Sequence, residues 1–174
     1  MLYKCCGILC YAIDEPTQHV YFLLGKETYD NLWCDFSGGP KRDENYLDTA
    51  VREFEEESMG LIMSADKMKQ ELRDNKYTLC LRMDNRVTFV KRIPFRPELP
   101  QLFADYRVDI LEEHEMAPLN LPPEWLEKSE IGWFSINKLN TLIRHDKIAH
   151  VSNLRLRKYF VNTLANILNF FMTH

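Results

Sequence analysis

The chain has 174 residues, of which 45% are hydrophobic and 28% are charged, and its net charge is −4. This length and composition indicate a folded protein of one domain, residues 1–174, and exclude a disordered chain. The weak negative charge excludes bulk attraction to nucleic acid or to an anionic membrane, but it neither excludes nor favours a small anionic substrate.

The first element is an apolar stretch, residues 2–13, which Lys4 interrupts. It is too short to span a membrane and lacks the layout of a signal peptide, so we expect no membrane partner. The chain has an odd number of cysteines without paired C-x-x-C spacing, which argues against a disulfide framework and against zinc. We therefore expect reduced thiols buried in strands and a cytoplasmic protein, with a nuclear location as the alternative. The cysteines are Cys5, Cys6, Cys10, Cys34 and Cys80.

Three strands are predicted before the first helix. Residues 3–13 and 19–25 are apolar runs separated by a turn, which indicates a hairpin. Residues 31–37 form a short strand that leads into a glycine-rich turn at Gly38 and Gly39, where backbone can approach a ligand closely. Trp33, just before this turn, could stack on a base, but a core position is the preferred interpretation.

A helix is predicted over residues 46–58. Asp43 or Asn45 can cap its start. Its apolar residues recur at the i, i+3, i+4, i+7 spacing that places them on one stripe of a helix. These residues are Leu47, Ala50, Val51 and Phe54.

Three glutamates of this helix are expected to converge opposite the apolar stripe. Glu53, Glu56 and Glu57 are three and four residues apart, so they are neighbours on the helix surface, whereas Glu55 points elsewhere. Like charges so close together destabilise an isolated helix, and a divalent cation with oxygen ligands removes that penalty. The alternative is a solvated acidic face that needs no ion. The turn upstream and the presence of Glu44, which Arg52 can pair with, favour the metal site.

The remaining elements alternate between strands and helices. A polar helix or loop is expected at residues 66–73, strands at 77–83 and 86–93, a helix at 102–115, a strand at 130–135, and helices at 136–144 and 153–171. This order predicts an α/β protein in which helices cover both faces of a mixed sheet.

The segment from Gly38 to Glu57 resembles the Nudix box. That signature is glycine, five residues, glutamate, seven residues, then Arg-Glu-apolar-any-Glu-Glu-any-Gly-apolar, and the chain matches it in type and spacing through Glu57. Met59 stands where the signature has glycine. We interpret this as a one-residue insertion that displaces the glycine to Gly60, and we expect the helix to run slightly longer.

The resemblance implies a fold, an activity and a metal. Nudix hydrolases cleave nucleoside diphosphates linked to another moiety, and their fold is an α/β/α sandwich with a mixed sheet. Glu53, Glu56 and Glu57 would bind Mg²⁺ or Mn²⁺, and the backbone carbonyl near Gly38 or Gly39 would add a ligand. The implied partner is a small anionic substrate that contains a pyrophosphate bond.

The resemblance also implies roles in catalysis. Glu56 is the best candidate for the general base, and Glu53 acts beside it. Arg52 would orient these carboxylates and hold Glu44, with Gly39 as further structural support. Some family members use a glutamate from a later loop as the base, and the candidates here are Glu112, Glu113 and Glu115.

Other functions stay open at this point. Hydrolysis of capped RNA or of a diphosphoinositol polyphosphate would need a basic groove beside the carboxylates. A non-catalytic Nudix-like binding module is less favoured, because such modules commonly lose signature glutamates that this chain retains. The amphipathic last helix could also pack against a second copy in a homodimer. Candidate phosphate-binding cations form two clusters, Lys91, Arg92 and Arg96, and Arg155, Arg157 and Lys158.

Overall fold

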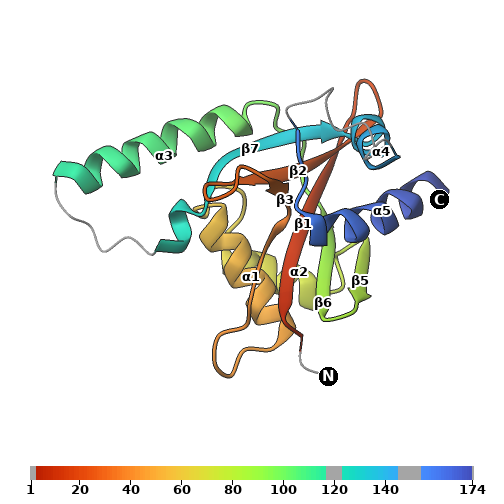
Figure 1. Cartoon of the computed structure of the whole chain (residues 1–174), viewed down its shortest axis with the longest axis horizontal. Helices are drawn as coiled ribbons and strands as arrows, with labels where there is room; N and C mark the ends of the chain where they lie inside the picture. Colours follow the sequence, from red (N-terminus) through yellow and green to blue (C-terminus); the bar gives the residue numbers. More distant parts are fainter. Residues whose placement is uncertain (1–2, 117–122, 145–153, 174) are drawn as a thin grey trace.

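The computed structural model describes residues 3–116, 123–144 and 154–173, and Figure 1 shows how their elements are arranged. The strands are β1 (Cys5–Asp14), β2 (His19–Glu27), β3 (Trp33–Cys34), β4 (Phe36–Gly38), β5 (Leu79–Met83), β6 (Arg86–Arg92) and β7 (Lys128–Ser135). The helices are α1 (Tyr46–Glu57), α2 (Ala65–Arg73), α3 (Leu99–Met116), the 3₁₀ helix η1 (Pro123–Leu126), α4 (Ile136–Arg144) and α5 (Lys158–Thr173). Most predicted elements are confirmed to within a few residues at their ends.

The described strands form one mixed sheet. Its central order is β3-β2-β1-β6-β5, with β4 paired to β1 and β7 paired to β2. Strands β1 and β6 are parallel, from Cys5 opposite Arg86 to Tyr11 opposite Arg92, and the other pairings are antiparallel. The predicted mixed sheet is therefore confirmed.

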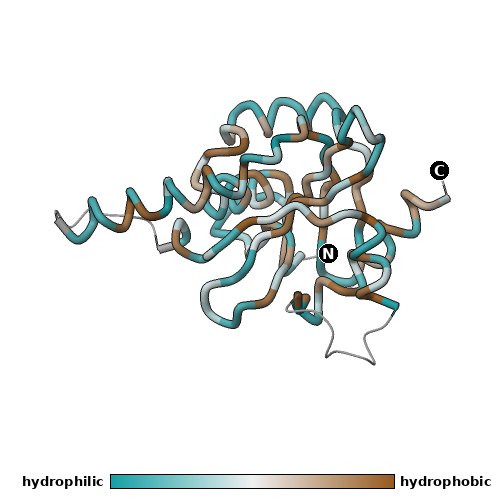
Figure 2. Tube along the Cα trace, turned by 90° about the horizontal axis from the view of Figure 1, so that it is seen from above, coloured by the Kyte–Doolittle hydropathy of each residue, from teal (hydrophilic) through white to brown (hydrophobic). Residues whose placement is uncertain are grey.

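Helices cover both faces of this sheet. Side chains alternate between the two faces of a strand, so an apolar strand such as β1 contributes to a core on each face. In β1, Ile8 and Cys10 face a core cluster with α1, α2 and α3, whereas Leu9 and Tyr11 face a second cluster with α4 and α5. Figure 1 shows α1 and α5 on opposite sides of the strands, and Figure 2 shows the trace coloured by hydropathy, with apolar segments near its middle. The α/β/α sandwich follows directly from this two-residue period.

Helix α1 begins at its predicted position. The Asn45 side-chain oxygen accepts hydrogen bonds from the backbone N–H groups of Leu47 and Asp48, at 2.9 and 3.0 Å. Asn45 is therefore the N-cap. Asp43, the other candidate, lies in the loop before it with φ of 64°.

The end of α1 differs from the prediction. The helix stops at Glu57, and the expected extension is wrong. Met59 itself takes the left-handed conformation, with φ of 53°, and Gly60 follows with φ of 69°. The Gly60 N–H donates to the Glu55 carbonyl and the Met59 N–H to the Glu56 carbonyl, which is the Schellman arrangement. Burial of the Met59 side chain, which is 4% exposed, offsets the strain of this backbone conformation.

Two other boundaries were also shifted by tertiary pairing. The strand predicted at residues 31–37 divides at the buried Asp35, because β3 pairs with β2 whereas β4 pairs with β1. The last helix begins at Lys158 and not at residue 153, which lies outside the described residues. Leu156 instead forms a parallel bridge with Trp33, so the backbone there is extended.

The five cysteines lie in strands β1, β3 and β5 as free thiols, as predicted, but only Cys6, Cys10 and Cys34 are buried, whereas Cys5 and Cys80 are half-buried. Among the described residues, no helix combines the length and the apolar character needed to cross a membrane.

Candidate active site

Arg52 joins several signature residues into one group. Its Nε donates to Glu44 Oε1 at 2.7 Å, and its Nη1 lies 2.7 Å from both Glu53 Oε1 and Glu56 Oε2. Its Nη2 donates to the Gly39 carbonyl at 2.8 Å. The planar guanidinium thus contacts three carboxylates and the glycine turn, and we call this group the Arg52 centre.

Glu44 is the most tightly held carboxylate of the Arg52 centre. It accepts two bonds from Arg52 and one from the Lys41 backbone N–H, at 2.7 to 3.0 Å. Hydrogen bonds from Arg52 lower the pKa of Glu44 to about 2. Glu44 is therefore ionised throughout the neutral range and can keep Arg52 in place.

Gly38 makes room for the Glu53 carboxylate. A Cβ atom at residue 38 would lie only 2.4 Å from the Glu53 carboxyl carbon, which is far inside van der Waals contact. Glu53 is buried beneath the turn, and this burial raises its pKa. The glycine is needed here because a carboxylate packs directly against the backbone.

Glu56 lies at the open side of the Arg52 centre. Its Oε2 accepts from Arg52 and its Oε1 lies 3.1 Å from Lys41 Nζ, with the Glu56 side chain 17% exposed. Lys41 also lies 3.3 Å from Glu124 in η1 and is itself 53% exposed. Solvent therefore reaches this glutamate more readily than Glu53.

Glu57 is the most deeply buried of the three helix glutamates. It is 1% exposed; its Oε2 accepts from the Ser37 N–H at 2.7 Å, and its Oε1 lies 3.1 Å from Lys128 Nζ. Burial raises the pKa of Glu57 to about 8. The three glutamates therefore have different cationic neighbours, because Arg52 contacts Glu53 and Glu56 whereas Lys128 contacts Glu57.

Lys128 links Glu57 to Glu27, and we call these three residues the Lys128 centre. The ammonium nitrogen lies 2.5 Å from Glu27 Oε1, and Arg157 Nη1 lies 3.5 Å from the same oxygen. Burial alone would lower the pKa of Lys128, but the charges of Glu57 and Glu27 keep it well above the usual range. Lys128 is therefore a permanent cation inside the molecule.

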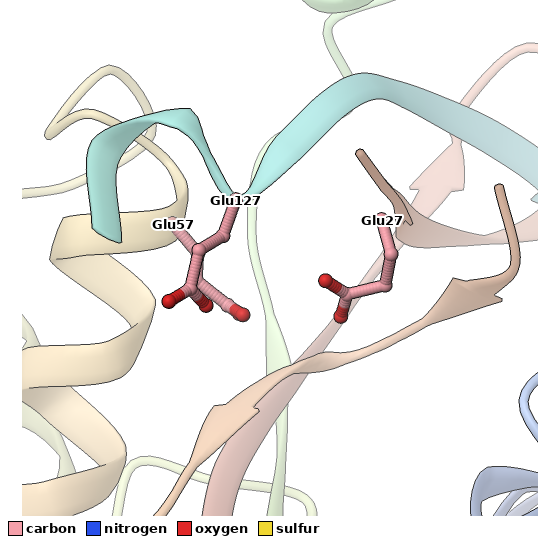
Figure 3. A group of neighbouring side chains, drawn as sticks. All are labelled: Glu27, Glu57 and Glu127. Carbon is pink, nitrogen blue, oxygen red and sulfur yellow. The ribbon is translucent and has the colours of Figure 1, made fainter. Parts of the chain in front are cut away.

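One carboxylate oxygen from each of Glu27, Glu57 and Glu127 lies within 4.8 Å of the others. Figure 3 shows that the three side chains come from the end of β2, the end of α1 and the segment before β7. Glu127 is exposed at residue level, and partial burial of its carboxyl raises its pKa. Glu27, Glu127 and Lys128 were not predicted from the sequence. They meet only through the pairing of β2 with β7, whose register shifts between Lys26 and Glu27, so two-residue alternation along β2 does not place Glu27.

The later glutamates proposed from sequence lie elsewhere. Glu112, Glu113 and Glu115 are exposed near the end of α3. This end of α3 extends beyond the rest of the molecule in both views (Figures 1 and 2). The glutamates that approach the motif from later in the chain are Glu124 and Glu127, because η1 packs against α1.

Some of the residues considered for substrate binding are engaged within the protein. Trp33 is buried and its ring packs against that of Phe134, which confirms the core interpretation. In the first basic cluster, Lys91 pairs with Glu71 at 2.7 Å. In the second, Arg157 Nε donates to Asp30 at 3.0 Å.

The residues present fit a divalent metal. Burial raises the pKa of Glu53, Glu57 and Glu127, so ionising all of them requires added positive charge. Carboxylates and backbone carbonyls are the ligands that Mg²⁺ and Mn²⁺ prefer. The glutamate cluster could therefore bind a metal ion. Around it the described carboxylates outnumber the cations: Glu27, Glu44, Glu53, Glu56, Glu57, Glu124 and Glu127 against Lys41, Arg52, Lys128 and Arg157.

Solved structures share this arrangement of elements over nearly the whole chain. The Caenorhabditis elegans Ap4A hydrolase in a binary complex is 14% identical, with 99% of this chain and 100% of that chain covered and a TM-score of 0.52. The Nudix hydrolase RenU of Mycobacterium smegmatis is 13% identical, with 98% and 87% covered and a TM-score of 0.54. The chain has the Nudix hydrolase fold.

A third structure with the Nudix fold is the NUDIX domain of Shewanella oneidensis NrtR, which was crystallised with ADP ribose. It is 9% identical, with 98% of this chain and 89% of that chain covered and a TM-score of 0.53. In sequence, the chain matches no family model and no curated protein. Identities this low establish the shared Nudix fold alone, and the fold agrees with the resemblance found at residues 38–57.

Proposed function

We propose that the protein is a metal-dependent hydrolase that cleaves a pyrophosphate bond in a nucleoside diphosphate linked to another moiety. The observation that carries this proposal is the Arg52 centre, in which one guanidinium gathers Glu44, Glu53 and Glu56 beside a glycine turn. Its position in a Nudix fold, with excess carboxylates around it, supports the same conclusion.

Glu53, Glu56 and Glu57 would hold Mg²⁺ or Mn²⁺, together with the backbone of Gly38. When bound, the metal neutralises phosphate oxygens and makes water a better nucleophile. Glu127 is an added candidate ligand, because its carboxylate lies within 4.8 Å of Glu57.

Glu56 is proposed as the general base that takes a proton from the attacking water. Its two present partners are the cations Arg52 and Lys41. The Lys41 side chain is 53% exposed, so a substrate phosphate can contact its ammonium. Glu56 then keeps Arg52 alone as a cationic partner.

A compact nucleotide substrate is favoured over an extended one. Capped RNA or a diphosphoinositol polyphosphate would require free cations along a groove, but one cation of each candidate cluster, Lys91 and Arg157, already pairs with a carboxylate inside the protein. The similar structures include an Ap4A hydrolase and a domain with bound ADP ribose, both of which concern nucleotides with linked phosphates. A non-catalytic module stays less favoured, since the signature glutamates are all present.

The test is a turnover screen of purified protein with Mg²⁺ and with Mn²⁺. The panel contains ADP ribose, nucleotide sugars, dinucleoside polyphosphates, deoxynucleoside triphosphates, capped RNA and inositol pyrophosphates. We expect turnover of a compact nucleotide, and the products identify the bond that is cleaved. Absence of turnover across the panel with both metals would contradict the proposed activity.

Glu56→Gln tests the proposed base. We expect the rate to fall about 10²–10⁴-fold, the usual contribution of a general base, with the fold unchanged. The matched control is Glu55→Gln on the same helix, whose side chain accepts from the Ala65 N–H at 2.8 Å and lies outside the Arg52 centre. Full activity of Glu56→Gln would remove Glu56 as the base.

A further inference from the structure

Lys128 is a fully buried ammonium among carboxylates. Its side chain is 0% exposed, and its Nζ lies 2.5 Å from Glu27 Oε1 and 3.1 Å from Glu57 Oε1. The Cys34 Sγ and the Asp35 carbonyl oxygen, both at 3.3 Å, complete its surroundings. A buried ammonium is costly unless such partners surround it, so its position is closely specified by the fold.

The sheet leaves a channel for this side chain. A Cβ atom at residue 25 would lie 2.8 Å from Lys128 Cδ and 3.0 Å from its Cε, so Gly25 keeps the path of the lysine stem open. Glu27 pairs directly with Lys128 across strands β2 and β7. The first residue of β7 therefore places a positive charge at the buried side of the carboxylate cluster.

This charge occupies the position of a cation between two potential metal ligands. Oxygens of Glu27, Glu57 and Glu127 lie close enough together to share one ion, yet Lys128 already contacts two of these three residues. The Ser37 N–H holds the other Glu57 oxygen. Arg157 is the second cation that faces Glu27, at 3.5 Å.

We propose that the Lys128 ammonium takes the place of one divalent cation in the carboxylate centre. It neutralises Glu27, holds the Glu57 carboxylate in a fixed position, and confines metal binding to the side of Glu57 where Glu53 and Glu56 lie, away from Glu27. Lys128 is thus a positioning residue that lowers the number of metal ions bound. This inference rests on the proposed function, because it requires a metal on the side of Glu53 and Glu56.

Two variants test the inference through binding of Mn²⁺, measured by calorimetry with MnCl₂ as the only added ligand. Lys128→Met leaves Glu27 and Glu57 without their shared ammonium, and we expect it to bind one more Mn²⁺ per chain than the wild type. Mn²⁺ should also raise its melting temperature by more than that of the wild type. Lys128→Arg, which keeps the charge, serves as the matched control for the stoichiometry.

Glu27→Gln in the wild-type background provides a second test, which leaves the Lys128 ammonium in place. We expect its Mn²⁺ stoichiometry and dissociation constant to match those of the wild type, because in the wild type Glu27 is already paired with Lys128. Fewer bound ions in Glu27→Gln would show that Glu27 ligates metal directly, which overturns the inference. Combined with Lys128→Met, the same substitution should abolish the extra ion.

The outcomes separate this inference from the proposed function. If the wild type binds Mn²⁺ but Lys128→Met shows the same stoichiometry and the same rise in melting temperature, the inference alone is overturned. If the wild type binds no Mn²⁺ and hydrolyses no substrate, the proposed function fails and the inference fails with it. Should Lys128→Met fold only in the presence of Mn²⁺, that dependence is itself the expected stabilisation.

Discussion

The Arg52 centre and the Lys128 centre solve the same electrostatic problem in different ways. Each places one cation against several glutamates, but Arg52 reaches residues within 13 positions along the chain, whereas Lys128 pairs with Glu27 from 101 positions away. The Arg52 side chain is 18% exposed, and that of Lys128 is completely buried.

This difference in exposure suits the Arg52 centre to contact substrate and places the Lys128 centre in the protein interior. A partly exposed guanidinium fork can orient several carboxylates and still leave Glu56 accessible to substrate and solvent. Water cannot replace the partners of a buried ammonium, so the fold is stable only while Lys128 stays paired with its carboxylates. Substitutions should therefore affect activity at the first centre and metal number and stability at the second.

The largest effect that separates the two centres is expected for Arg52→Lys. Lysine retains the charge but loses the planar fork, so Glu53 and Glu56 are no longer oriented together. We expect the rate of hydrolysis to fall about 10²-fold, as for other small misplacements of catalytic groups. Steady-state kinetics at saturating metal measures this, and a variant as fast as the wild type would show that charge alone suffices.

An intermediate effect is expected for Gly38→Ala. The new Cβ must displace the Glu53 carboxylate, which lies 2.4 Å from its position, so we expect turnover to fall by about tenfold or more. The adjacent Gly39→Ala is a matched control, because its Cβ would meet only the Lys4 carbonyl at an ordinary 3.7 Å. Equal activities of the two variants would contradict the close packing of Glu53 beneath the turn.

The smallest effect is expected for Glu44→Gln, which weakens the anchor of Arg52. We expect a loss of about 1 kcal/mol in the free energy of unfolding at pH 7, because the ion pair is partly open to solvent. Arg52 lowers the folded pKa of Glu44 from 4.5 to about 2, so its contribution is complete above about pH 5 and declines as pH falls toward 2. Urea unfolding of both proteins at pH 7, 5 and 3.5 should show the difference shrinking, and a constant difference would indicate a cause other than charge.

Much of the Arg52 centre was predictable because its residues lie close together in the sequence. The helical period gave the span of α1 to within one residue, and the spacing of Glu44 and Arg52 in the signature anticipated their contact. The end of α1 was not predictable in the same way. A glycine one position late suggested a longer helix, but Met59 adopts the left-handed conformation because its side chain is buried in the core.

The Lys128 centre was beyond prediction because it depends on three segments that meet only in the folded sheet. Neither the position of Lys128 before an apolar strand nor that of Glu27 after another one reveals that β2 and β7 pair. The same limit explains the last helix, whose start depends on the bridge between Leu156 and Trp33. Both cases require knowledge of which strands are neighbours.

The amino-acid sequence by itself determined the helix of the signature, the order of the elements and the carboxylates that Arg52 gathers, because these follow from residue spacing of at most a few turns. Tertiary structure alone decided that Glu57 turns inward, and that Glu27, Glu127 and Lys128 join it. The physical reason is that burial and strand pairing arise only when the sheet forms and packs against the helix, and these bring charges that are distant in sequence into contact.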